Sequence, residues 1–170
     1  DDLIYIEKAL ILLCGSKDLK FIIEDDIFRI FPDLRIGGVM GRGLRVRERL
    51  KELDDLIEDN KKKLLERMEN KKPTDFTNIT SWRDTFLQTG VNYKKYRPGV
   101  EVLVRRVING HDIPVINTAV NACRAAEMLT MLPIGGYDLT AIRGDISLKV
   151  STGGEMFKSL EEGNIEFTEP

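Results

Sequence analysis

The longest regular pattern of apolar positions lies between residues 46 and 68. Apolar residues recur there every three or four positions, and Glu, Asp, Lys and Arg fill most of the positions between them. This spacing predicts one face of a long amphipathic helix. The stripe consists of Val46, Leu50, Leu53, Ile57, Asn60, Leu64 and Met68, with Asn60 as its polar interruption. Such a helix usually packs on the flank of a domain, but a dimeric coiled coil or an RNA-facing arm would carry the same charged surface.

Two shorter helices are predicted further along the chain. Thr80 or Ser81 can cap the first helix, which precedes a glycine at position 90. The second helix begins near Pro98, because proline suits the first helical turn. Within that second helix Glu101 and Arg105 are four residues apart, so we expect them to form an ion pair.

Strand-like runs surround these helices without a regular βαβ rhythm. The runs are residues 20–25, 34–44 and 144–150, while residues 3–13 fit either a helix or a buried strand. A short helix, capped by Asp25 or Asp26, is expected between the runs at 20–25 and 34–44. This mixture predicts an α+β fold with a mixed sheet flanked by helices.

A fourth predicted helix, from Asn117 to Leu132, carries a polar stripe. Asn117, Asn121 and Arg124 follow one another at spacings of four and three residues. Amide and guanidinium groups are costly to bury without partners. These side chains therefore either bond to neighbouring backbone or line a polar pocket.

The segment LPIGGYDL follows this helix directly. Pro133 cannot continue the helix and glycine tolerates unusual backbone angles, so we expect a tight turn from Pro133 to Gly136. The turn has two interpretations: a plain helix stop, or one wall of a small cavity. In the second interpretation Gly135 and Gly136 expose backbone amides, Tyr137 offers an aromatic platform, and Asp138 offers a carboxylate.

Composition narrows the chemistry. The chain of 170 residues is 42% hydrophobic and 32% charged, with a net charge of −2, as in ordinary globular proteins. No apolar run is long enough to cross a bilayer. Cys14 and Cys123 are far apart, which favours reduced thiols and a cytoplasmic setting. With His111 as the single histidine, we expect no metal site and no cofactor.

KYRP, INTAVN and LPIGGYDL, in this order and at this spacing, resemble the editing module of the phenylalanyl-tRNA synthetase β subunit. The chain looks closest to freestanding relatives of that module, described as tRNA-binding-domain proteins. The resemblance covers roughly residues 27–170. It implies an α+β domain that accepts the 3′ end of a tRNA; in the synthetase, the module hydrolyses wrongly attached tyrosine.

The resemblance also assigns a site. In the family, the helix before the turn and the turn itself form the amino-acid pocket, which implies that the substrate is bound by Asn117, Asn121, Arg124, Gly135, Gly136, Tyr137 and Asp138, with Cys123 on the same helix. The synthetase has a histidine where this chain has Gly135, and usually an asparagine in place of Arg124. The freestanding relatives share the glycine pair. The family's module continues beyond Pro170, so we expect residues 20–170 to be a single domain that is truncated at its end, preceded by an N-terminal segment, residues 1–19.

The implied partner is tRNA or aminoacyl-tRNA. Cationic side chains that could meet its phosphates are Lys94, Lys95, Arg97, Arg105 and Arg106, and Tyr93 and Tyr96 lie among them as possible stacking platforms. We expect a tRNA-binding protein, for which two functions remain open. One is a trans-editing hydrolase that deacylates misacylated tRNA, with Asn121 and the glycine amides orienting the water or the ester. The other is a non-catalytic module that binds an amino acid or an RNA 3′ end. No catalytic residue is assigned, and a homo-oligomer through the 46–68 helix is a further option.

Overall fold

The structure, a computed structural model, describes residues 8–14, 19–158 and 165–167. The chain separates into two compact units: unit 1 comprises Asp1–Lys17 with Asp33–Ile142, and unit 2 comprises Asp18–Pro32 with Arg143–Pro170. Strand β1 (Lys8–Cys14) lies in the expected N-terminal segment, yet it pairs with two strands of unit 1.

Unit 1 contains a three-stranded sheet in the order β3-β1-β4. Both β3 (Arg35–Gly41) and β4 (Ile134–Asp138) run parallel to β1, and Leu12 of β1 lies opposite Val39 and Gly136. The expected tight turn from Pro133 to Gly136 is therefore wrong, because most of it belongs to β4. The local pattern of a proline and two glycines could not reveal this pairing, because the partner strand lies near the start of the chain.

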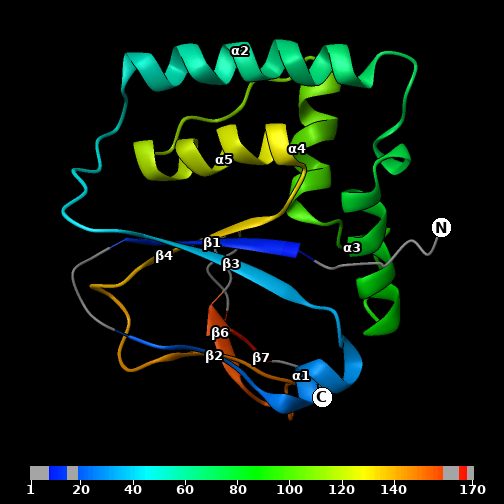
Figure 1. Cartoon of the computed structure of the whole chain (residues 1–170), viewed down its shortest axis with the longest axis vertical. Coiled ribbons are helices and arrows are strands. Elements are labelled where there is room, and N and C mark those ends of the chain that lie inside the picture. Colours follow the sequence, from blue (N-terminus) through cyan, green and yellow to red (C-terminus); the bar gives the residue numbers. More distant parts are fainter. Residues whose placement is uncertain (1–7, 15–18, 159–164, 168–170) are drawn as a thin grey trace. The chain divides into compact units, whose positions relative to one another are not determined.

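Four helices and one 3₁₀ turn make up the rest of unit 1 in the part of it that the structure describes. They are α2 (Lys51–Met68), η1 (Pro73–Asp75), α3 (Thr77–Gln88), α4 (Gly99–Ile108) and α5 (Thr118–Thr130). In Figure 1, α5 lies between α2 and the sheet. Helix α2 begins later than its apolar stripe, and the early stripe residues Val46 and Leu50 are exposed.

The predicted cap of the second helix is wrong. Helix α3 begins at Thr77, and neither Thr80 nor Ser81 precedes it. Their hydroxyl groups instead donate to backbone carbonyls one turn earlier, such as Thr80 Oγ1 to Thr77 O at 3.1 Å and Ser81 Oγ to Thr77 O at 2.9 Å. Both residues can bond to the backbone from inside a helix as well as from its start, so their presence does not fix the boundary.

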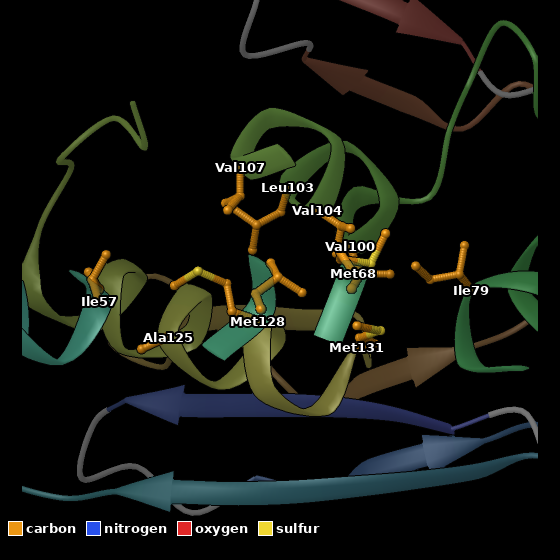
Figure 2. Packing of buried hydrophobic residues seen from close by; sticks show 11 residues of the cluster. Ile57, Met68, Ile79, Val100, Leu103, Val104, Val107, Ala125, Met128 and Met131 are labelled. Atoms are coloured by element: carbon orange, nitrogen blue, oxygen red, sulfur yellow. The ribbon is translucent and has the colours of Figure 1, made fainter. Parts of the chain in front are cut away.

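The apolar side chains of these helices meet in one core. Figure 2 shows Met128 of α5 near Leu103 of α4, and Ala125 on the side of Ile57, within the same cluster. The buried residues of the core are Ile57, Leu64, Met68, Ile79, Val100, Leu103, Val104, Val107, Ala125, Met128 and Met131. The stripe of α2 is thus largely buried inside unit 1. Asn60, its polar member, is also buried, and its Nδ2 donates to the carbonyl of Ala125 at 2.9 Å.

Unit 2 is smaller. It holds β2 (Phe21–Ile23), α1 (Asp25–Ile30), β5 (Ile146–Leu148), β6 (Met156–Lys158) and β7 (Ile165–Phe167). Strands β2 and β5 pair in parallel, and β6 and β7 pair antiparallel. The cap position of α1 is Glu24, without a side-chain cap, so Asp25 and Asp26 lie in the first turn instead of capping it. The predicted α+β class is confirmed.

Candidate functional site

Helix α5 starts from a well-defined cap. Asn117 has extended backbone angles, and its Oδ1 accepts a hydrogen bond from the backbone N–H of Val120 at 2.9 Å, the usual role of an N-cap asparagine. Next to it, the N–H of Thr118 donates to Arg47 O at 2.9 Å and the N–H of Arg47 donates to Thr118 Oγ1 at 3.0 Å. This reciprocal pair holds the segment before α2 against the start of α5.

The end of α5 is fixed equally firmly. Met131 adopts a left-handed conformation, with φ 54°, and its N–H donates to the carbonyl of Glu127 at 2.7 Å. The helix therefore stops at Thr130, two residues earlier than predicted. The side chain of Glu127 then reaches across the connection, where its Oε1 accepts from the N–H of Ile134 at 2.9 Å. This bond determines where β4 begins relative to α5.

A cleft of about 800 Å³ opens between α5, β4 and residues 43–46, all within unit 1. Its lining residues are Gly43, Leu44, Val46, Asn117, Ala119, Val120, Cys123, Arg124, Glu127, Ile134, Gly136, Tyr137, Asp138 and Thr140. Most of the residues expected to bind substrate, namely Asn117, Arg124, Gly136, Tyr137 and Asp138, are thus brought to one cleft.

Asn121 and Gly135 are not part of this lining. Asn121 is only 1% exposed and lines a separate cleft of about 340 Å³, where its Oδ1 lies 3.5 Å from the N–H of Ile116. Helix geometry explains the separation: at about 100° per residue, Asn121 and Glu127 lie about 60° from Arg124 in opposite directions, so Asn121 is about 120° around the axis from Glu127, which lines the first cleft. The expected polar stripe therefore divides between two clefts.

Arg124 is held in place by backbone. Its Nη1 donates to the carbonyl of Pro114. This bond agrees with the first sequence-based interpretation, in which the polar side chains of the helix bond to neighbouring backbone. The side chain is half-buried and also lines the cleft. For this residue the two interpretations hold together.

Two carboxyl groups line the cleft, and their environments differ. Burial raises the pKa of Glu127, while the Ile134 N–H and the charge of Arg124 oppose that increase. Asp138 is exposed, and hydrogen bonds from the hydroxyl and the N–H of Thr140, at 2.7 and 2.9 Å, lower its pKa. Sequence reasoning missed Glu127, although it follows Arg124 by three residues and so lies on the same side of the helix.

Outside the cleft, three arginines surround one buried carboxylate. Glu101 is fully buried, and Arg83 binds it through two hydrogen bonds of 2.7 and 2.6 Å. The predicted pair with Arg105 is present at 2.6 Å, and Arg97 lies 3.9 Å away. Burial by itself raises the pKa of Glu101, but the hydrogen bonds and charges of Arg83 and Arg105 outweigh it and lower that pKa.

The remaining cationic candidates lie nearby in sequence but have different environments. The Nε of Arg106 donates to the carbonyl of Asp112. Lys95 lies 4.7 Å from the ring centre of Tyr96, whose ring is among the exposed apolar groups. Arg83, which the sequence did not single out, also lies 5.1 Å from the ring centre of Tyr93. The pairing of Arg83 with Glu101 joins α3 to α4 and leaves no local sequence signal.

Among the residues that the structure describes, no helix is long and apolar enough to cross a membrane. No match to the chain was found among curated proteins or among solved structures. A family model does match: the B3/4 domain, over residues 81–170, which is more than half of the chain and includes α4, α5 and β4. This domain occurs in the editing module of the phenylalanyl-tRNA synthetase β subunit. The chain belongs to the B3/4 domain family.

Proposed function

We propose that this protein binds the aminoacyl 3′ end of tRNA in the cleft beside α5. The observation that carries the proposal is the convergence of Asn117, Arg124, Tyr137 and Asp138 on one cleft of about 800 Å³. Ligand sites typically have volumes of roughly 300–1,000 Å³ and combine apolar walls with a few polar groups. A terminal adenosine carrying an amino acid is a ligand of this size and mixed character.

The lining chemistry matches the parts of such a ligand. Tyr137 is 42% exposed and gives a ring on which a base can stack. Hydrogen bonds from Thr140 lower the pKa of Asp138, so its carboxylate can pair with the α-ammonium group of an aminoacyl ester. Leu44, Val46 and Val120 give the cleft an apolar side for the amino-acid side chain.

The cationic residues support the RNA part of the proposal. Glu101 neutralises only one of the three arginines around it, so Arg83, Arg97 and Arg105 leave a net positive charge at that surface. Lys94 and Lys95 precede Arg97 in sequence. Phosphate contacts of this kind make binding weaker as salt increases. A cytoplasmic setting, where tRNA is charged, is part of the same proposal.

A cleft-filling variant tests the proposal. Gly136 lines the cleft, and a Cβ added there would meet no atom within 4 Å, so Gly136→Leu adds bulk to the cleft wall without a clash at Cβ. We expect it to weaken binding of a tRNA that carries an amide-linked, non-hydrolysable amino acid by at least tenfold, measured by filter binding across a panel of amino acids.

A matched control is available in the same sheet. Gly38 lies in β3, has no atom within 4 Å of an added Cβ and does not line the cleft. Gly38→Leu should bind the same tRNAs as the wild type does. If Gly136→Leu binds these tRNAs as tightly as the wild type does, the proposed site is wrong. If the wild type binds no charged tRNA, the proposed function is wrong.

Helix α2 buries much of the surface through which a homo-oligomer was expected. The residues of the apolar stripe that α2 was expected to use, including Ile57, Leu64 and Met68, are buried within unit 1. Leu56 and Leu65 are each 46% exposed and lie on the same helix. Self-association through α2 therefore stays a prediction that would depend on this second pair, and a molar-mass measurement of wild type and Leu65→Glu in solution tests it.

A further inference from the structure

The cleft contains a carboxyl group that the binding proposal does not use. Glu127 lies on α5, three residues after Arg124, and both side chains line the cleft. Its Oε1 is held by the N–H of Ile134 at 2.9 Å. Among the described residues, the structure gives Oε2 no hydrogen-bond donor. One oxygen of the carboxyl group is thus fixed by backbone, and the other remains available to a ligand or a water molecule.

We propose that Glu127 is the general base of an aminoacyl-ester hydrolase and that Arg124 stabilises the negative charge that forms on the ester carbonyl oxygen. This inference rests on the proposed binding of an aminoacyl 3′ end, and it favours trans-editing over a non-catalytic module. Anchoring of the Arg124 guanidinium by Pro114 O fixes its position before a substrate arrives, as electrostatic stabilisation requires.

The two carboxyl groups of the cleft divide the work between them. Hydrogen bonds from Thr140 lower the pKa of Asp138, which suits its carboxylate to hold an ammonium group. Burial makes Glu127 a better proton acceptor than an exposed glutamate. Paired carboxyl groups whose pKa values are shifted in opposite directions commonly mark separate binding and proton-transfer roles.

The reaction balances without a further reactant. The oxygen of water forms a bond to the ester carbonyl carbon, and one proton of that water passes to Oε2 of Glu127. The bond between the carbonyl carbon and the ribose oxygen then breaks, and Glu127 returns the proton to that ribose oxygen. The products are a free amino acid and an uncharged tRNA, and Glu127 is ionised again.

The competing explanation is that Glu127 only joins α5 to β4. Glu127→Gln distinguishes the two, because an amide oxygen can still accept from the N–H of Ile134 but the side chain can no longer take a proton. The substrates are tRNAs charged separately with each standard amino acid and labelled at the terminal adenosine, and the rate without protein is subtracted. For the tRNA that wild type hydrolyses fastest, we expect Glu127→Gln to reduce kcat by roughly 100- to 10,000-fold, with thermal unfolding and binding of the amide-linked analogue unchanged.

The matched control is Glu66→Gln, an exposed glutamate on α2 outside the cleft, which should hydrolyse at the wild-type rate. Hydrolysis by Glu127→Gln at the wild-type rate overturns the inference. Binding of the amide-linked analogue by a wild type that hydrolyses none of the charged tRNAs also overturns it, but leaves the proposed binding function standing. Loss of binding by the wild type removes both proposals.

The pH profile gives a second test that does not depend on a variant folding well. As a base, Glu127 must be ionised, so kcat should rise with pH through its pKa and then level off. The other ionisable groups that line the cleft are Cys123, Arg124, Tyr137 and Asp138. Because Arg124 lowers the pKa of Glu127, Arg124→Gln should move the rising limb to higher pH. A wild-type profile without a rising limb in the acidic range overturns the inference.

Discussion

The two faces of helix α5 belong to different kinds of environment. Ala125 and Met128 are buried among aliphatic side chains of α2 and α4, whereas Asn117, Arg124 and Glu127 line the cleft. The core face follows the helical repeat and needs only residues of suitable size. The cleft face depends on which distant backbone each polar group meets. The surroundings of the side chains on one face of a helix can therefore be predicted from sequence, while those on its other face cannot.

The strongest way to disturb the helical interior is to remove its buried charge. Glu101→Ala leaves Arg83, whose side chain is only 18% exposed, without the carboxylate that binds it twice. Breaking a buried ion pair by removing one partner costs about 3–5 kcal/mol. We expect a loss of that size in the free energy of unfolding, measured by urea denaturation. A loss below about 1 kcal/mol, the range of exposed pairs, would show that the arginines are already satisfied by water.

The same carboxylate predicts a pH dependence. The pKa of Glu101 is lowered in the folded state, so its contribution to stability is complete above the unfolded pKa of about 4.3. That contribution should be lost as pH falls below that value through the folded pKa. Thermal unfolding of the wild type between neutral and acidic pH should show this loss, and Glu101→Gln should lack that part of it. Parallel curves for the two proteins would contradict the assignment.

A pair of truncations sharpens the contrast between the two faces of α5. Met128 is fully buried, and Met128→Ala should destabilise the protein by about 2–5 kcal/mol. Val120 lines the cleft and is half-buried, so Val120→Ala should cost only about 1 kcal/mol. Binding of the amide-linked aminoacyl-tRNA should respond in the opposite order, with Val120→Ala weakening it more. Chemical denaturation and filter binding on the same preparations measure both effects.

Part of the helical interior of unit 1 could be predicted from sequence. Pro98 predicted the start of the helix α4, and the four-residue spacing predicted the pair of Glu101 with Arg105; the structure confirms both. These features depend on neighbours within one or two helical turns. The α+β class was also predicted, from strand-like and helical segments that do not alternate regularly.

The parts that escaped prediction depend on distant partners. Strand β4 pairs with β1, where Gly136 lies opposite Leu12, and a proline with two glycines indicates a turn when that partner is unknown. Arg83 reaches Glu101 from 18 positions away on another helix. Glu127 was overlooked because a glutamate on a helix is usually a solvated surface residue, and only its bond to Ile134 N shows that it is held.

Asn117 lies where the two environments meet, and it gives the smallest expected effect on stability. Its Oδ1 caps α5 by accepting from Val120 N, while the residue also lines the cleft. Asn117→Ala should cost about 1 kcal/mol, the usual value of a lost N-cap. Asn117→Asp keeps an acceptor at that position and should retain wild-type stability, since a negative charge is also favourable at a helix N-terminus. It nevertheless removes the Nδ2 donor, so it should weaken binding of the amide-linked aminoacyl-tRNA if the amide contacts the ligand. If Asn117→Asp binds as the wild type does, Asn117 serves only as a helix cap. The polar side chains assigned to the ligand would then be Arg124 on α5 and Tyr137 and Asp138 on β4.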